Sequence, residues 1–287
     1  MRFEGIAEIG IIGGTGSDIE LENAEDLKIY TPYGFTSDFI KVGDFKGKKI
    51  AFLSRHGREH IIPPHNLNNK ANIWALKELG VKYIISPSAV GSLKKEHPKG
   101  KFILVDQYID RTKKRSETFY DGGQLCHIGQ ADPYCEYLNS LFYENGKNVP
   151  GLKIRNGGTY VCVEGPRFST RAESKMFRFW GGDIIGMTTY PEVVLAAEKE
   201  LCYCCIAMVT DLDVWAAECT NCGVVEFGVK CPQCGRPIKK LSVSVEEVLK
   251  TMAENADNLR KLLEITIPKI NIERDCSCRH SLTNALI

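Results

Sequence analysis

The sequence lacks the features of a membrane protein, a nucleic-acid-binding protein or a secreted protein. No apolar run approaches the ~20 residues that a membrane-spanning helix needs. Its 37 Lys and Arg residues balance 36 Asp and Glu residues, for a formal net charge of +1. Nucleic acids and membrane surfaces call for a clustered basic excess, so we expect neither partner. Residues 1–5 include an acid and no apolar segment, so we expect no signal peptide and a cytoplasmic protein.

Two nucleotide-binding motifs are also missing. The chain has neither a Gly-Lys-Ser/Thr phosphate loop nor a Gly-x-Gly-x-x-Gly fingerprint, which disfavours a dinucleotide-dependent oxidoreductase. Instead, the β-branched run of Glu8–Ser17 stops at Gly13, Gly14, Thr15 and Gly16. Such a run predicts a buried parallel strand that ends in a tight turn. The N–H groups of that turn and its hydroxyls are suited to holding an anion such as phosphate, although a turn without a ligand has the same pattern.

Predicted strands alternate with predicted helices along the chain. This alternation indicates an α/β fold, with a mixed, mostly parallel sheet flanked by helices. We find no repeat and no low-complexity tract, so we expect a single domain over residues 1–287. A small cysteine-rich module is embedded in it at residues 216–241.

Polar residues follow the predicted strands at six places. In open α/β sheets, ligands bind outside the carboxyl ends of the strands. We therefore expect one composite active site, built from Thr15, Arg55 and His56, Ser88 and Ala89, Glu164–Phe168, Met187 and Thr188, and Asp211–Asp213.

The residue types at these strand ends favour a reaction with free phosphate. Arg55 is a bidentate donor for phosphate, and His56 and hydroxyl groups add further hydrogen bonds. No cluster of carboxylates for Mg²⁺ accompanies them, which favours inorganic phosphate over a metal-chelated nucleotide. Taken alone, each feature also has a structural explanation, such as a core-edge Arg–His pair.

Asp211 and Asp213 follow a strictly apolar strand, and their spacing points both carboxylates to one side of it. Two close carboxylates raise the pKa of one of them, so that it holds a proton near neutral pH. Such a pair suits protonation of a ring nitrogen, although strand-end acids also face solvent or cap helices. Phe168 is suited to stacking on a flat base or to core packing.

Several motifs in register then resemble the 5′-methylthioadenosine phosphorylases, members of the trimeric purine nucleoside phosphorylase family. They include Ile-Gly-Ile-Ile-Gly-Gly-Thr-Gly, Ser-Arg-His-Gly-Arg-Glu-His, Val-Glu-Gly-Pro-Arg-Phe-Ser-Thr-Arg-Ala-Glu-Ser, Gly-Met-Thr-Thr-Tyr-Pro-Glu-Val-Val-Leu-Ala and Thr-Asp-Leu-Asp-Val-Trp. The resemblance covers the chain from about residue 8 to about residue 270, interrupted by the cysteine-rich module.

This resemblance implies roles for individual residues. The phosphate contacts correspond to Thr15, Arg55, His56, Ser88, Ala89 and Thr188, where Ser88 replaces an expected threonine. The catalytic pair corresponds to Asp211 and Asp213. The substrate-binding positions correspond to His60, Phe168, Ser169, Met187, Asp211, Leu212, Asp213, Val245 and Val248.

The resemblance also implies a reaction, namely phosphorolysis of 5′-methylthioadenosine to adenine and 5-methylthioribose 1-phosphate. The two acids favour a 6-amino purine, and Val245 and Val248 favour a 5′-methylthio group. A 6-oxopurine nucleoside or 5′-methylthioinosine phosphorylase remains the alternative, and a zinc-ribbon module on an inactive scaffold is another. A homotrimer or homohexamer is implied, and no catalytic cofactor, since phosphate is a substrate.

The sequence has 12 cysteines. Four of them, Cys219, Cys222, Cys231 and Cys234, have the paired Cys-x-x-Cys spacing of a structural metal site, with zinc as the expected ion. Iron, two disulfides or free thiols remain alternatives. Cys276-x-Cys278 resembles a C-terminal feature of some thermophilic members, which implies a disulfide, and two unpaired thiols are the alternative. Cys135 with Cys204 or Cys205 is a further candidate bridge, and the connectivity stays open.

Overall fold

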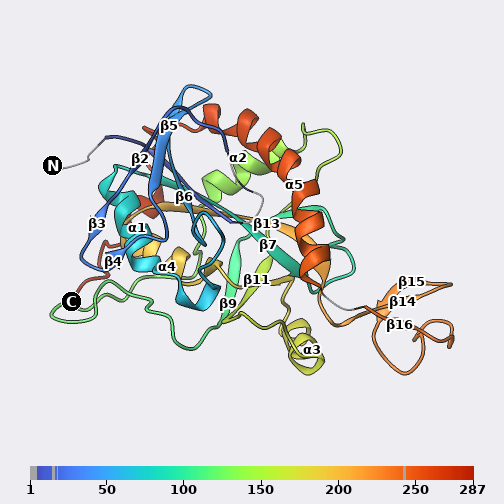
Figure 1. Ribbon diagram of the computed structural model, residues 1–287. Coiled ribbons are helices and arrows are strands. Elements are labelled where there is room, and N and C mark those ends of the chain that lie inside the picture. The colour runs from blue at the N-terminus through green and yellow to red at the C-terminus, as the bar shows by residue number, and fades with distance from the viewer. Residues whose placement is uncertain (1–4, 15–16, 18, 242–243) are drawn as a thin grey trace.

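The computed structural model describes residues 5–14, 17, 19–241 and 244–287, and its fold is mixed α/β, as expected (Figure 1). One 11-stranded sheet has a main path in the order β10-β8-β13-β7-β1-β6-β5-β2, while β12 pairs with β7, and β11 links β12 to β9. The strands of this sheet are β1 (Ile9–Gly13), β2 (Glu22–Leu27), β5 (Ile40–Phe45), β6 (Lys48–Ser54), β7 (Tyr83–Ser92), β8 (Lys101–Leu104), β9 (Gln107–Arg111), β10 (Lys153–Asn156), β11 (Thr159–Val163), β12 (Ile184–Gly186) and β13 (Cys202–Leu212).

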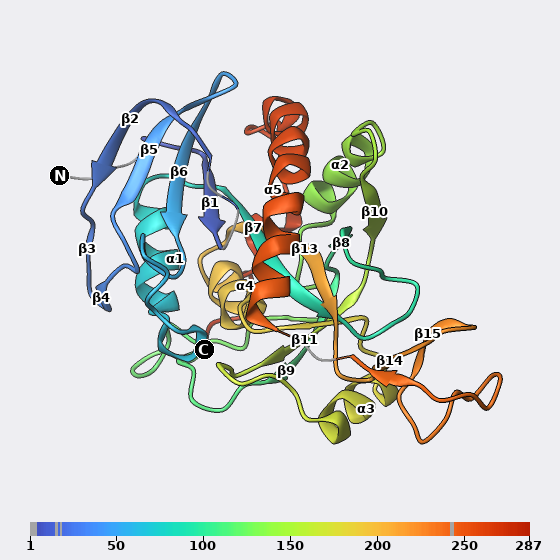
Figure 2. The ribbon, with the colours of Figure 1, turned by 45° about the vertical axis from the view of Figure 1, so that its right-hand side comes forward.

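Helices cover both faces of this sheet (Figure 2). They are α1 (Asn69–Glu78), α2 (Glu136–Gly146), α3 (Arg171–Phe179), α4 (Thr189–Glu198) and α5 (Val245–Thr266), with short 3₁₀ turns η1 (Pro64–Asn66), η2 (Ile267–Lys269) and η3 (Ser277–His280). A hairpin of β3 (Tyr30–Thr31) and β4 (Gly34–Phe35) lies apart from the main sheet. Within the described ranges, no helix has the length and apolar character to cross a membrane.

The hydrophobic core is divided by the sheet into two layers. On one face, Ile12 and Tyr203 pack with Ile73 of α1 and Val193 of α4. On the other face, residues of alternate strand positions pack with α2 and α5, including Ile9, Ile11, Cys202, Leu138 and Leu262. Successive strand side chains point to opposite faces, so a fully buried strand needs apolar residues throughout, as in β1 and in residues 202–209 of β13.

The predicted mostly parallel sheet is confirmed by the strand pairings. Of the ten pairings in the large sheet, six are parallel and four antiparallel. The central strands β7 and β13 run parallel, with a register shift between Val209 and Asp211. The carboxyl ends of β1, β6, β7 and β13 therefore meet at one edge of the sheet.

Close neighbours explain why glycines stand at the end of β1. A Cβ atom added at Gly13 would lie 2.5 Å from the ring of Phe52, and one at Gly14 would lie 2.9 Å from Nη1 of Arg55. The chain thus approaches its neighbours too closely for any side chain at either position. Thr15, predicted to bind phosphate in this turn, lies outside the described residues.

The cysteine-rich segment forms a small sheet of its own, separate from the large one. It consists of β14 (Ala216–Cys219), β15 (Gly223–Glu226) and β16 (Lys239–Lys240), in the order β15-β14-β16. In Figures 1 and 2 it projects from the body of the molecule beside α3. Its core cluster contains Ala217, Val225, Cys219 and Cys231.

Candidate active site

A cavity of about 360 Å³ opens at the carboxyl-terminal edge of the large sheet. Most of the predicted site residues line it. They are Arg55, His56, His60, Ser88, Ala89, Phe168, Ser169, Met187, Thr188, Asp211, Asp213 and Val248. They come from six separate stretches of the chain, as expected for a ligand site at strand ends.

Two of the predicted residues do not line the cavity. Leu212 packs against the cluster of Trp215 and Ile185, because it points opposite to its neighbours Asp211 and Asp213. Val245 is 61% exposed, because it is the first residue of α5, about one turn before Val248. Only Val248 of the two valines therefore reaches the cavity.

Arg55 lines the cavity, but most of its guanidinium is already bound inside the protein. Its Nε donates to Oε1 of Glu192 at 2.6 Å, and both side chains are 1% exposed. Nη2 donates to Ser86 Oγ at 2.7 Å and to the carbonyl oxygen of Ile12 at 3.0 Å. Glu192 therefore occupies the Nε edge of the guanidinium, and a phosphate contact of Arg55 stays a prediction for the rest of the group. Nη1, which donates to the Pro87 carbonyl oxygen at 3.2 Å, faces Gly14.

Sequence reasoning missed Glu192 altogether. This acid is fully buried in α4, among Val193, Val194 and Leu195. Tyr203 donates to its Oε2 at 2.7 Å and Ser86 donates to the same oxygen at 3.0 Å. An acid within an otherwise apolar helix is a signal for such a buried pair, because an unpaired buried carboxylate is strongly disfavoured.

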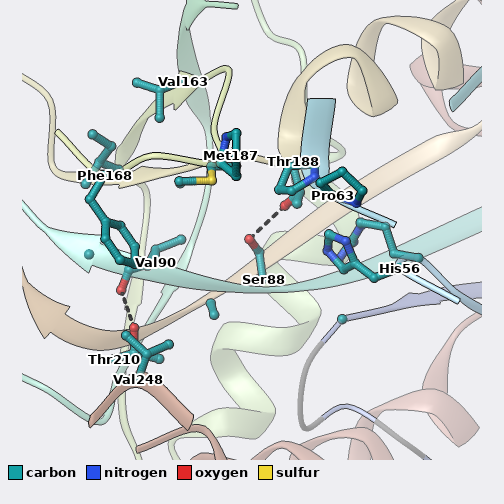
Figure 3. Close-up of a pocket in the computed structure, with 18 of the residues that line it drawn as sticks. His56, Pro63, Ser88, Val90, Val163, Phe168, Met187, Thr188, Thr210 and Val248 are labelled. Carbon is teal, nitrogen blue, oxygen red and sulfur yellow. Dashed lines mark hydrogen bonds between the residues drawn. The ribbon is translucent and has the colours of Figure 1, made fainter. Parts of the chain in front are cut away.

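Hydroxyl groups line one end of the cavity. Ser88 and Thr188 are hydrogen-bonded at 2.9 Å (Figure 3). The hydroxyl oxygen of Tyr160 lies 3.2 Å from that of Ser88. Ser88 and Thr188 are 3% and 8% exposed, so water does not compete strongly for them. These hydroxyl groups can donate hydrogen bonds to an anion, and they are themselves uncharged.

His56 stands at the same end of the cavity, next to Pro63 in Figure 3. Its Nδ1 lies 2.8 Å from the carbonyl oxygen of Ile62, which can only accept, so Nδ1 carries the proton. Burial, with the nearby Arg55 charge, lowers the pKa of His56 to about 4. The ring is therefore neutral near pH 7 and leaves Nε2 as an acceptor. The His60 ring lies 4.3 Å from it, measured between ring centroids.

Asp211 and Asp213 form the acidic end of the cavity. Burial raises the pKa of Asp211 to about 6, and the nearby Asp213 adds to this, against a hydrogen bond from Thr210 at 2.8 Å. Burial also raises the pKa of Asp213, against the nearby Ser174 hydroxyl and Val214 N–H, which lower it. The Oδ2 atom of Asp213 is buried without a hydrogen-bond partner among the described residues. An orphaned carboxylate oxygen beside a cavity points to a ligand donor that fills the gap.

An apolar wall faces these acids. Figure 3 shows Phe168, Val90 and Val248 on one side of the cavity, with Met187 between them and Thr188. Phe168 is 44% exposed, so its ring is available to stack on a flat ligand. The cavity thus has a hydroxyl-rich end and an apolar end with two buried acids.

The cysteines of the projecting sheet lie close together. Sulfur atoms of Cys219, Cys222, Cys231 and Cys234 are all within 4.8 Å of one another, and those of Cys219 and Cys234 are 3.6 Å apart. Each pair is followed by a glycine at positive φ, Gly223 at 69° and Gly235 at 72°. Four thiolates at ~2.3 Å from one tetrahedral zinc ion lie about 3.8 Å apart, so these residues fit that ion.

The fold and this cavity define an enzyme of the purine nucleoside phosphorylase type, a pentosyltransferase. A family model described as "Phosphorylase superfamily" matches residues 8–268, and the chain belongs to that superfamily. Within it, the chain is similar to proteins named S-methyl-5′-thioadenosine phosphorylase, which confirms the resemblance expected from the sequence. The relative from Hyperthermus butylicus is 48% identical, with 98% of this chain and 96% of the relative covered. The relative from Saccharolobus solfataricus is 47% identical, with 98% and 97% covered.

Solved structures agree with this assignment. A methylthioadenosine phosphorylase from an antarctic soil metagenomic library superposes with a TM-score of 0.85 at 37% identity, covering 99% of this chain and 93% of that one. A methylthioadenosine phosphorylase from Schistosoma mansoni, in complex with adenine, superposes with a TM-score of 0.81 at 29% identity, covering 97% and 98%.

Proposed function

We propose that this enzyme cleaves 5′-methylthioadenosine with inorganic phosphate, giving adenine and 5-methylthioribose 1-phosphate. The single observation that carries the proposal is the buried Asp213 Oδ2, which lacks a partner beside an acid whose pKa is near 6. An adenine ring supplies what these two carboxyl groups need, namely a 6-amino donor and a basic N7. The names of the relatives, at 47% and 48% identity, support the same substrate.

Phosphate binds at the hydroxyl-rich end in this proposal. Its ligands are Thr15, Ser88, Thr188, the backbone at Ala89, His56 through Nε2, and Arg55 through Nη1. His56 accepts at Nε2, so it contacts a phosphate oxygen that carries a proton. Arg55 contributes its charge and is bonded to the end of β1 at Ile12, since Glu192 takes its other edge. The sugar lies between the two ends, beside His60, Ser169 and Met187, and its 5′ group faces Val248.

The reaction breaks the bond between C1′ of the ribose and N9 of the purine. A phosphate oxygen forms the new bond to C1′ with inversion, and the bound phosphate stabilises the positive charge that develops on the sugar. Asp211 or Asp213, in its protonated form, gives its proton to N7 as the electron pair leaves with the base. The carboxyl regains a proton from solvent after adenine departs. No catalytic cofactor takes part.

We further propose that residues 1–287 form one phosphorylase domain with an embedded module at 216–241, and that the module holds a structural zinc ion on Cys219, Cys222, Cys231 and Cys234. The sulfur spacing of 3.6 Å between Cys219 and Cys234 supports zinc. All ligand positions would be protein thiolates, so zinc would supply stability to the module and no open coordination position for chemistry.

A homotrimer, or a homohexamer built from trimers, is the assembly we propose. Large apolar side chains left exposed in the single chain support an assembly, among them Phe179 at 90% and Ile61 at 73%. A cytoplasmic location is also part of the proposal, and the 12 free thiols of the structure support a reducing compartment. Light scattering on the purified protein measures the assembly directly.

The proposal is tested by release of base from four nucleosides: 5′-methylthioadenosine, adenosine, 5′-methylthioinosine and inosine. We expect the highest kcat/KM for 5′-methylthioadenosine. A preference for the two inosine forms would replace this function by the alternative, a 6-oxopurine nucleoside or 5′-methylthioinosine phosphorylase. No turnover of any of the four would overturn both.

A further inference from the structure

A second group of four cysteines lies far from the projecting module. Cys135 precedes α2 as its N-cap residue, Cys202 is the first residue of β13, and Cys276 and Cys278 lie in the C-terminal segment. Their sulfur atoms are all within 4.8 Å of one another, although up to 143 positions separate them in the sequence. All four are free thiols in the structure.

The sulfur spacings in this group fit a tetrahedral ion. The Cys135 and Cys276 sulfurs are 3.7 Å apart, and the Cys276 and Cys278 sulfurs are 3.8 Å apart. Thiolates at ~2.3 Å from a tetrahedral zinc ion lie about 3.8 Å from one another. A disulfide requires about 2.05 Å. The group therefore has the dimensions of the cysteine cluster in the projecting module, where the sulfur atoms of Cys219 and Cys234 are 3.6 Å apart.

The surrounding backbone holds these thiols in place without any metal. The Cys135 N–H donates to the carbonyl oxygen of Tyr203 at 2.9 Å, which ties the start of α2 to β13. The Arg279 N–H donates to the carbonyl oxygen of Cys276 at 2.8 Å, which shapes the turn between the last two cysteines. Tyr83 donates to the carbonyl oxygen of Asn271 at 3.0 Å and so anchors the segment that precedes them.

Burial makes the same group suited to a metal that water does not displace. Cys135 and Cys202 are fully buried and belong to one hydrophobic core cluster. Cys276 and Cys278 are partly buried and pack against that cluster. No histidine or carboxylate belongs to the group, and an all-thiolate set selects zinc among the common divalent ions.

We propose that Cys135, Cys202, Cys276 and Cys278 bind a second structural zinc ion, which fastens the C-terminal segment to α2 and β13. Binding replaces the thiol protons, which pass to solvent, and involves no oxidation. The site lies at the start of β13, whereas Asp211 lies near its end, roughly 30 Å away at ~3.3 Å per residue. The ion therefore stabilises the fold and takes no part in the reaction.

The experiment measures zinc per chain by inductively coupled plasma mass spectrometry, on protein purified without chelator and without oxygen. We expect two zinc ions in the unchanged protein, one for each cysteine group. The variant Cys276→Ser/Cys278→Ser should retain one, and Cys219→Ser/Cys222→Ser should also retain one. Combining all four substitutions should leave none.

Cys126→Ser is the matched control, because Cys126 belongs to neither group, and it should keep both ions. The Cys276→Ser/Cys278→Ser variant, called here the tail variant, should also lose thermal stability. Its kcat/KM at 25 °C should stay unchanged. Zinc content that does not fall in the tail variant would overturn the proposal. So would intact-mass spectra of the unchanged protein, alkylated while denatured, that show Cys276 and Cys278 within disulfides.

Discussion

Arg55 and Glu192 form a fully buried ion pair at the hydroxyl-rich end of the cavity, with Nε and Oε1 2.6 Å apart. The pair joins the loop after β6 to helix α4. The second carboxylate oxygen of Glu192, Oε2, accepts hydrogen bonds from Ser86 and Tyr203. The positive charge nearest the expected phosphate is thus fixed by an internal acid before any ligand binds. Such pre-arrangement reduces the reorganisation needed when an anion enters.

Substituting Glu192 should therefore destabilise the protein strongly. Glu192→Ala leaves the Arg55 charge buried and unpaired, which costs about 3–5 kcal/mol. Urea denaturation measures the free energy of unfolding. Arg260→Ala is the matched control, because Arg260 pairs with Asp257 and Glu264 at the exposed surface, and such pairs contribute about 1 kcal/mol or less. Equal losses in both variants would contradict the internal role of Glu192.

Asp213→Asn should impair the cleavage of adenine nucleosides selectively. The change removes the acceptor at the orphaned Oδ2 position and the possible proton donor, and such a loss costs about 10²-fold or more in kcat/KM. Inosine analogues lack the amino group, so they should lose less. Glu218→Gln, an exposed change on the projecting sheet, is the control. An equal loss for adenine and hypoxanthine nucleosides would exclude base reading by Asp213.

The stability of the protein should depend on pH through Asp211. Its pKa is about 6 in the folded state against 3.8 as the ordinary value, so folding favours the protonated form. This contribution is full below pH 3.8 and is lost as the pH rises through about 6. Asp211→Asn removes the ionisation and should gain up to about 3 kcal/mol relative to the unchanged protein at pH 8.

The measurement compares urea denaturation of both proteins at pH 4.5 and at pH 8, where the advantage of Asp211→Asn should grow between the two values. An advantage that stays constant or shrinks would show that the carboxyl titrates at its ordinary pKa.

Val248→Ser should shift the preference for the 5′ group. A hydroxyl in place of the valine methyl groups weakens the apolar contact with a methylthio group, by about 1–3 kcal/mol. The ratio of kcat/KM values for 5′-methylthioadenosine and adenosine should fall accordingly, by about 10-fold or more. Val245→Ser is a matched control, because Val245 is 61% exposed and does not line the cavity. A similar fall in both variants would remove Val248 from the 5′ pocket.

The sequence predicted the fold class and most of the cavity lining for one physical reason. Buried parallel strands such as β1 and β13 need apolar residues on both faces, so their ends are visible as abrupt changes to polar residues. Asp211 and Asp213 were found in this way. The strands Glu22–Leu27 and Ile40–Phe45 were not predicted, since β2 is largely exposed and acidic and carries no alternating pattern.

Long-range pairing is what the sequence could not supply. Glu192 stands 137 positions from Arg55, and nothing in either local pattern says that they meet. Cys135 was expected near Cys204 or Cys205, yet it lies beside Cys202, Cys276 and Cys278. The family resemblance assigned Val245 and Leu212 to the substrate site, but only their neighbours line the cavity. Helix phase and strand alternation decide which side chain points inward, and a resemblance between motifs does not show this.

The central claim is that phosphate attacks the sugar, and phosphorus NMR tests it most directly. The enzyme is incubated with 5′-methylthioadenosine and inorganic phosphate, and the phosphorus signals are followed while adenine is quantified. We expect one sugar 1-phosphate signal to grow in step with adenine, and no adenine without phosphate. Adenine released at the same rate without phosphate, together with free 5-methylthioribose, would mean that water is the nucleophile and would contradict this account.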